Sequence, residues 1–235
     1  YGVTALMARV YLCQENLTDA LACAQEVIDS KRFEFMNDSI NNVYAYRNLS
    51  YIEKMARHEY VSSLYVYDLK EGRSDLFFKN LASCECVIAE GRKASIYSGM
   101  GQDLDIRSKN WFETPAGSAT EYVNKYMRGT QIPLLKLSEM YLIAAEASGD
   151  IRYLETLRAN RGYATDPLPA GANLQDEITK EYQKEFIAEG QLFYYYKRRN
   201  MAILPITSTS MNRATYVLPV PDNELEFGNF CLLYT

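Results

Sequence analysis

The sequence contains one histidine, His58, and one tryptophan, Trp111. A single imidazole rules out most histidine-based metal sites and argues against a Ser-His-Asp triad. Glycine-rich phosphate loops and nucleophile elbows are absent from the sequence. No apolar run is long enough to cross a bilayer. The chain therefore shows no catalytic constellation, no cofactor motif and no membrane-spanning segment.

Cysteine residues are few, and basic residues are fewer than acidic ones. The five cysteines are odd in number and form no C-x-x-C pair, which is typical of free, mostly buried thiols and leaves the compartment open. Cys84 and Cys86 would share one face of a strand, where a disulfide would be strained. The net charge is -5, so the chain has no overall attraction to nucleic acid or to an anionic membrane.

Tyrosine, in contrast, is abundant, with 20 residues in a chain of 235. This length allows one large domain or two small ones with a sizeable core. Tyrosine is amphipathic and suits binding surfaces as well as cores. The sequence starts directly in an apolar helical pattern without an initiator methionine or a signal peptide, and we interpret it as part of a longer protein or as one trimmed at its N-terminus.

Residues 3–30 have the pattern of a helical hairpin. Small residues at Ala8, Ala20 and Ala24 would let two antiparallel helices approach closely, as in a tetratricopeptide hairpin. Thr18 or Asp19 is expected to cap the second helix. Because such a hairpin leaves an apolar face uncovered, we expect it to pack against the later helices.

Three more helices are predicted in the second half of the chain. The first has Pro133 in its first turn and ends at Gly149. The second covers residues 151–161 and ends at Gly162. The third is a long helix over residues 174–199 that Asn173 caps. The predicted organisation is a single mostly α domain with a helical hairpin at 1–30, an irregular insert at 31–130, helices at 131–200 and an extended tail at 201–235.

The insert is expected to hold a few short strands, the clearest at residues 59–68. A second run, Cys86 to Ile88, is also strand-like. Asp103 and Asp105 could in principle bind Ca²⁺, but the full calcium-loop pattern is missing, so a salt bridge between Asp105 and Arg107 is favoured.

Glu181, Glu185 and Glu189 share one face of the predicted long helix. They could form a carboxylate site for a metal or for acid-base chemistry. Ion pairing with the neighbouring arginines is favoured, and Glu185 and Glu189 are predicted to be at least half buried with an arginine or backbone donors as partners. The available arginines are Arg158, Arg161, Arg198 and Arg199.

Gly190 interrupts this helix, either for close packing or for a change of direction. The aromatic run from Phe193 to Tyr196 covers every face of the next turn, which is typical of a packing element.

Several of these segments resemble the SusD/RagB-like proteins, surface nutrient-binding lipoproteins of Bacteroidetes. The segment 132–147, IPLLKLSEMYLIAAEA, resembles the strongest motif of the family and contains Glu139. Residues 154–162, with Arg158, resemble the L-N-x-x-R-x-R-x-G segment. The closing segment LPVPDNELEFGN, residues 218–229, resembles the family's I-P-x-x-E-x-x-x-N.

Two further segments complete this resemblance. Asp105-Ile-Arg107 resembles the family's D-x-R, and the run from Glu181 to Arg198 resembles E-x-x-x-E-x-x-x-E-G-x-R-x-x-D-x-x-R through its three glutamates, Gly190 and Arg198. The sequence departs from the family at four positions, which carry Lys136, Glu155, Leu192 and Tyr195.

The resemblance implies stacked tetratricopeptide-like hairpins, an irregular ligand-binding region, and no enzymatic activity, metal or cofactor. It implies a protein on the extracellular face of the outer membrane, held by a lipid anchor outside this sequence. Its expected partners are an oligosaccharide or peptide and a SusC-like TonB-dependent transporter. The alternatives are a tetratricopeptide scaffold that binds a partner chain and a glycosidase with paired carboxylates.

The ligand residues are predicted from aromatic side chains in polar, irregular segments. These candidates are Trp111, Tyr44, Tyr46 and Tyr97. An aromatic ring beside polar side chains suits the apolar face and the hydroxyl groups of a sugar. Trp111 has an alternative role as a core anchor of the insert.

Overall fold

The computed structural model divides the chain into two compact units, Tyr1–Glu189 and Gly190–Thr235. The structure describes residues 1–35, 57–67, 87–88, 91–97, 105–114, 121–123, 125, 131–205 and 207–217.

The first unit begins with the predicted hairpin of α1 (Gly2–Cys13) and α2 (Leu17–Asp29). The small residues Ala8, Ala20 and Ala24 are all fully buried, so the two helices pack closely, as the sequence pattern predicts. The predicted cap was wrong. Asn16 caps α2 and accepts a hydrogen bond from the Asp19 amide at 3.3 Å. Helix α2 begins at Leu17, so Thr18 and Asp19 already lie in its first turn.

The second hairpin consists of α8 (Leu137–Ser148) and α9 (Ile151–Arg158), which continues into the π-helical turn η2 (Ala159–Tyr163). Helix α8 ends as predicted, with Gly149 in the left-handed conformation at φ 70°. Pro133 lies in a strand and not in the first turn of the helix. Proline lacks an amide hydrogen, and an edge strand tolerates it as well as a helix start does.

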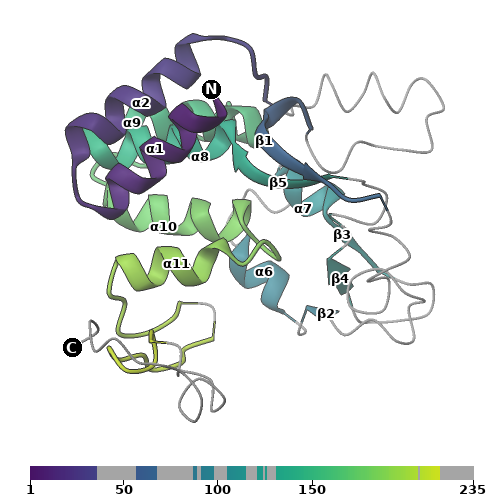
Figure 1. The fold of residues 1–235 in the computed structure, drawn as a ribbon. Coiled ribbons are helices and arrows are strands. Elements are labelled where there is room, and N and C mark those ends of the chain that lie inside the picture. The colour runs from purple at the N-terminus through teal and green to yellow at the C-terminus, as the bar shows by residue number, and fades with distance from the viewer. Residues whose placement is uncertain are drawn as a thin grey trace, which may run out of the picture. The chain divides into compact units, whose positions relative to one another are not determined.

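The two hairpins pack on each other through α2 and α8, as predicted (Figure 1). Two polar contacts join them. Arg9 of α1 donates to both carboxylate oxygens of Glu139 at 2.6 and 2.7 Å, and Gln25 donates to the Tyr153 hydroxyl at 2.6 Å. Their shared core consists of Ala5, Ala8, Leu12, Ala20, Ala24, Val27, Leu135, Met140, Ile143 and Ala144.

Two small sheets lie beside the helices. Strand β1 (Tyr60–Tyr65) follows the short helix η1 (Arg57–Glu59) and pairs antiparallel with β5 (Gln131–Lys136). The predicted strand at 59–68 is thus present, with shorter bounds. The second sheet has the order β2–β4–β3 and is antiparallel. Its strands are Val87–Ile88, Glu121–Val123 and Phe112–Glu113.

Three further helices lie in the described residues of the first unit: α6 (Arg92–Ile96), α7 (Ile106–Asn110) and α10 (Leu174–Glu185). The predicted cap of α10 is confirmed, because the Asn173 side chain accepts from the amides of Gln175 and Asp176 at 2.9 and 3.2 Å. Helix α10 packs against α8. The mostly α fold class is confirmed, and no helix in the described ranges is long and apolar enough to span a bilayer.

The predicted long helix 174–199 is in fact two helices. Helix α10 ends at Glu185, and α11 (Gln191–Arg198) begins the second unit. Ala188 and Gly190 have φ values of 60° and 72°, a left-handed conformation that no α-helix accommodates. Gly190 therefore redirects the chain, one of the two roles that its position suggested.

The described residues of the second unit, 190–205 and 207–217, form α11 and a series of turns with a bridge between Ile203 and Ser210. Tyr195 and Tyr196 are buried, whereas Tyr194 is 66% exposed, so the aromatic run packs on part of its surface only. The Tyr216 hydroxyl donates to the Met201 carbonyl at 2.8 Å. The proline-rich stretch of the tail beyond Val217 lies outside the described residues.

Candidate functional site

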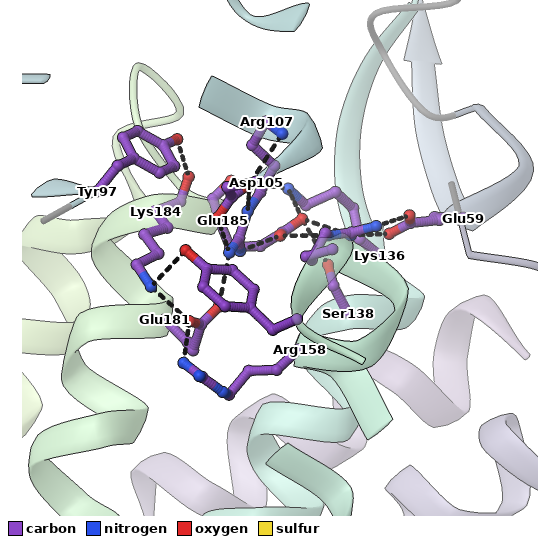
Figure 2. Close-up of polar contacts among 12 residues, drawn as sticks. Glu59, Tyr97, Asp105, Arg107, Lys136, Ser138, Arg158, Glu181, Lys184 and Glu185 are labelled. Carbon is purple, nitrogen blue, oxygen red and sulfur yellow. Dashed lines mark hydrogen bonds and ion pairs between the residues drawn. The ribbon is translucent and has the colours of Figure 1, made fainter. Parts of the chain in front are cut away.

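Most of the charged side chains that are buried in the first unit form one connected cluster, which we call the polar node (Figure 2). They come from η1, α7, β5, α9, η2 and α10 and from the turn at Lys125, and thus connect the described segments of the insert with the helices. Its members are Glu59, Asp105, Arg107, Lys125, Lys136, Arg158, Arg161, Glu181, Lys184, Glu185 and Glu189.

Glu185 lies at the centre of the node. Arg161 donates to both of its carboxylate oxygens at 3.1 Å, and Arg107 donates to Oε2 at 3.1 Å. Lys136 Nζ and Ser138 Oγ contact Oε1 at 3.3 and 3.0 Å. Burial alone would raise the pKa of Glu185, but the charges of Arg161, Lys136 and Arg107 hold it well below its usual value.

Glu181, one helical turn before Glu185, has a similar environment. Arg107 and Lys184 each donate to its carboxylate at 2.9 Å, and Arg158 Nη1 lies 3.6 Å away. Burial opposes ionisation, but the nearby charges of Arg107, Lys184 and Arg158 outweigh it and lower the Glu181 pKa to about 2. The predicted structural ion pairing of these glutamates is therefore confirmed.

Asp105 both caps α7 and pairs with Arg107. Its side chain accepts from the Arg107 amide at 2.9 Å, from Nε at 3.0 Å and from Nη2 at 2.8 Å. This confirms the predicted salt bridge. Asp103, its proposed partner in a calcium site, lies outside the described residues. Within the described ranges, no group of three or more His, Cys, Asp and Glu residues is arranged to hold a metal ion.

Arg161 connects Glu185 to the insert. Its guanidinium donates to both oxygens of Glu59 at 2.6 and 2.7 Å. Arg161 lies in the π-helical turn η2, in which Gly162 adopts φ 106°. Burial would lower the Arg161 pKa, but Glu185 and Glu59 raise it, so the guanidinium is permanently charged.

Glu189 is paired with lysines, where the sequence predicted an arginine or backbone donors. Lys136 Nζ lies 2.8 Å from Glu189 Oε1, and Lys125 Nζ also contacts this oxygen. Lys125 donates to the Glu185 carbonyl at 2.8 Å and lies 3.8 Å from the centroid of the Trp111 ring. Burial, only partly offset by Glu189, lowers the Lys125 pKa to about 8.

The pairing pattern decides what the node can do chemically. A general acid at neutral pH needs a carboxyl group with a raised pKa. In Glu181, Glu185 and Glu189 the pKa is lowered instead. The node therefore stabilises the packing of the described insert segments on the helices. Its carboxyl groups do not have the properties of a catalytic acid-base pair.

The predicted ligand residues fall into two groups. Trp111 is 1% exposed and Tyr97 is fully buried. The Tyr97 hydroxyl donates to the Lys184 carbonyl at 3.1 Å, and its ring meets Phe112 edge-on. Burial of Trp111 agrees with its alternative role as a core anchor. Tyr44 and Tyr46 lie outside the described residues. A ligand-binding role for these four residues stays a prediction.

The motif residues have structural contacts. Glu139 pairs with Arg9, and Gly190 begins α11. The Arg158 guanidinium lies over the Tyr163 ring at 4.5 Å, and Arg198 lies over Tyr195 at 5.5 Å. These contacts explain why the motif carries charged residues at buried or half-buried positions.

Two exposed tyrosines of the insert were not among the predicted ligand residues. Tyr65 ends β1 and is 67% exposed, and Tyr67 is 83% exposed. Gln131 of β5 is the strand partner of Tyr65 and brings an amide to the same edge. Strand alternation could have suggested Tyr65, but exposure at the end of a strand depends on the rest of the fold. Among the described residues, these two side chains are the insert's exposed aromatics.

The comparisons with known proteins agree with this architecture. No protein-family model and no curated protein matches the chain. Several solved structures do, and most of them are named as SusD superfamily proteins. A Bacteroides vulgatus protein named as a candidate sugar-binding protein has a TM-score of 0.68 at 22% identity, over 96% of this chain and 56% of its own.

Two further neighbours are SusD superfamily proteins by name. One from Bacteroides vulgatus has a TM-score of 0.62 at 19% identity, over 97% of this chain and 57% of its own. One from Bacteroides thetaiotaomicron has a TM-score of 0.64 at 19% identity, over 84% of this chain and 48% of its own. The chain thus has the SusD superfamily fold, as its resemblance to that family implied, and spans about half the length of these structures.

Proposed function

We propose that this protein captures a nutrient, an oligosaccharide in the first instance, and delivers it to a TonB-dependent transporter of the outer membrane without changing it chemically. The observation that carries the proposal is the SusD superfamily fold over nearly the whole chain, shared with a protein named as a candidate sugar binder. The lowered pKa values of the buried glutamates support a role without acid-base chemistry.

The location proposed with this function is the extracellular face of the outer membrane, with a lipid anchor outside the present sequence. A SusC-like transporter is the proposed protein partner. Both proposals rest on the resemblance of the sequence motifs and on the fold.

The exposed aromatics of the insert suit the proposed ligand. Tyr65 and Tyr67 each offer a ring and a hydroxyl group to solvent, and Gln131 adds amide donors and acceptors nearby. Aromatic rings pack on the C–H faces of sugars, while hydroxyl and amide groups bind the sugar hydroxyls. We propose that these two tyrosines contribute to ligand contact, together with the predicted residues Tyr44 and Tyr46.

The test is a glycan-array screen of the complete protein, followed by calorimetric titration of the glycan that binds best. Binding without release of products on prolonged incubation is the expected result. Product formation would establish an enzyme instead, and no binding to any glycan would overturn the oligosaccharide proposal. The tyrosines are tested by Tyr65→Ala and Tyr67→Ala, each expected to weaken binding about tenfold, equivalent to about 1.4 kcal/mol.

Tyr194→Ala is the matched control, because Tyr194 is 66% exposed and belongs to the second unit. Its substitution should leave the dissociation constant unchanged. If all three variants bind like the parent, Tyr65 and Tyr67 are not ligand residues. The second candidate function, peptide binding by a helical scaffold, is favoured by the paired hairpins, and the same titration with mixed peptide libraries distinguishes it.

A further inference from the structure

The charged residues between Gly190 and Val217, in the second unit, are all basic. This stretch contains four basic residues and no aspartate or glutamate. The basic residues are Lys197, Arg198, Arg199 and Arg213. The whole chain has a net charge of -5, so the stretch is opposite in charge to the rest of the sequence. A basic segment in an otherwise acidic chain indicates an anionic partner for that segment.

Three of the four basic residues lie at the C-terminal end of α11. Lys197 and Arg198 are in the last turn of the helix, and Arg199 directly follows it. Lys197 and Arg199 are exposed, and Arg198 is half-buried over the ring of Tyr195. Basic residues in a last turn also stabilise the helix itself, because its C-terminus carries a partial negative charge. This local role explains neither the fourth basic residue nor the lack of acidic ones.

Arg213, the fourth basic residue, is brought back toward the same end of the helix. The Met211 amide donates to the Ala202 carbonyl at 2.7 Å, and the Tyr216 hydroxyl donates to the Met201 carbonyl at 2.8 Å. Arg213 lies between these two donors in the sequence, so it is held near the residues that follow α11. Its side chain is exposed. The turn therefore adds a further positive charge close to the end of α11.

Large apolar side chains are also exposed in this unit. Tyr194 precedes Lys197 and Arg198 by three and four positions, which places its exposed ring on their face of α11. Ile203 and Val217 are each 59% exposed. Aromatic and aliphatic side chains beside basic ones are typical of proteins that lie on a membrane, since the rings enter the headgroup region and the cations meet lipid phosphates.

We propose that the basic end of the second unit binds a membrane surface with anionic, phosphate-bearing headgroups. We call this end the α11 basic surface and define it by Lys197, Arg198, Arg199 and Arg213. Guanidinium groups bind phosphate oxygens through two parallel hydrogen bonds, and an ammonium group binds them as a point charge. The exposed ring of Tyr194 favours lipid over a soluble anionic polymer, because a polymer bound by charge alone needs no apolar contact.

The inference goes beyond the nutrient-binding proposal. The tyrosines proposed for ligand contact, Tyr65 and Tyr67, belong to the first unit, and the α11 basic surface belongs to the second. Glycan binding and membrane binding can therefore be measured separately and can fail separately.

The test is sedimentation of the 235-residue chain with sucrose-loaded vesicles. Vesicles of phosphatidylglycerol and phosphatidylcholine in equal parts are compared with vesicles of phosphatidylcholine alone. The expected result at about 0.1 M salt is at least about tenfold stronger binding to the anionic vesicles. Most of this binding should be lost at about 1 M salt, where the Debye length falls to about 3 Å.

Paired substitutions separate the α11 basic surface from the charge of the whole chain. Lys197→Gln with Arg213→Gln should weaken binding to the anionic vesicles about 30-fold, which is about fivefold for each charge removed. Arg152→Gln with Lys180→Gln is the matched control, because it changes the net charge equally at exposed positions of the first unit. Tyr194→Ala should weaken binding at both salt concentrations, because it removes the apolar contact.

Four outcomes would overturn the proposal. The first is equal binding, or no binding, to the two kinds of vesicle. The second is an equal loss of binding in the two paired variants, which would mean that only net charge matters. The third is binding to soluble dextran sulfate but not to vesicles, which would assign the surface to an anionic polymer.

The fourth outcome concerns a rival occupant within the chain. Asp222, Glu224 and Glu226 follow the basic stretch in the sequence and could bind it in place of lipid. In that case the parent chain would not sediment with anionic vesicles, whereas Glu224→Gln with Glu226→Gln would, and the α11 basic surface would be assigned to the acidic segment.

Discussion

Arg161 and Glu59 meet fork to fork in the interior of the first unit, with Nη1–Oε1 and Nη2–Oε2 distances of 2.6 and 2.7 Å. The two residues are 102 positions apart in the sequence. Both side chains are completely buried. This one contact ties the start of β1 to the turn after α9, and Glu185 binds the same guanidinium from α10.

Removal of one partner of this contact is expected to be costly. Arg161→Met would leave Glu59 and Glu185 without this guanidinium in the interior, at a cost of about 3–5 kcal/mol in the free energy of unfolding. Urea denaturation followed by circular dichroism measures it. Arg152→Met is the matched control, because Arg152 pairs with Asp150 at the surface, and it should leave the urea midpoint unchanged. A small effect of Arg161→Met would show that the node contributes little to stability.

Stability is expected to fall in acid because of the same node. The pKa of Glu181 is lowered from 4.5 to about 2 in the folded protein. A lowered pKa stabilises the folded state above the unfolded-state value, and this contribution is lost as the pH falls from about 4.5 to 2. A difference of this size corresponds to about 3 kcal/mol. Glu185 and Glu189 shift in the same direction.

The measurement is the free energy of unfolding between pH 6 and 2, in the parent and in Glu181→Gln. The variant has no carboxyl group at this position, so its stability should depend less steeply on pH in this window. If the free energy of unfolding depends on pH with the same slope in both proteins, the partners of Glu181 do not lower its pKa in the folded state.

The close approach of α1 and α2 gives a third prediction. Ala24 is fully buried between helices, so Ala24→Leu would force them apart and cost about 1–3 kcal/mol. Ala22 lies on the exposed side of the same helix, and Ala22→Leu should be nearly neutral, because leucine is only slightly less favourable than alanine for helix formation. Thermal unfolding of the two variants checks this. Equal midpoints would contradict close packing at Ala24.

The break between α10 and α11 gives a fourth prediction, in which substitutions at two nearby positions change the stability differently. Gly190 has φ 72°, and a Cβ added there would meet no atom within 4 Å, so Gly190→Ala would be destabilised by backbone strain alone, by about 1 kcal/mol. Ala188 has φ 60°, and Ala188→Gly would relieve such strain and leave stability equal or slightly raised. Chemical denaturation of both variants should therefore show a lower midpoint for Gly190→Ala only.

The helical parts of the fold were readable from the sequence because their signals are local. Ala8, Ala20 and Ala24 mark the first hairpin, and Gly149 and Asn173 mark helix ends by their own backbone and side-chain chemistry. The errors arose where two local rules compete. Pro133 suits a helix start as well as an edge strand, and pairing with β1, residues 60–65, decided for the strand.

The polar node was predictable only in part. The glutamate stripe on one helix face indicated buried ion pairs, and Asp105 was correctly assigned to Arg107. Glu59 and Lys125 were not identified, because single charged residues in irregular segments have no periodic signal. Their contacts depend on chain segments that are far apart in sequence, and no pattern along the chain encodes such a meeting.

The long sequence separations within the node have a kinetic consequence. Several of its ion pairs join residues 102, 78, 74 and 64 positions apart, whereas the two helical hairpins are closed by residues that are near in sequence. Contacts between distant residues require the closure of large loops and form after local ones. We therefore expect the node to form after the rate-limiting step of refolding, so that its loss should speed unfolding while leaving the refolding rate nearly unchanged. The buried charges would then set the unfolding rate, and with it the lifetime of the native state, more than the speed of folding.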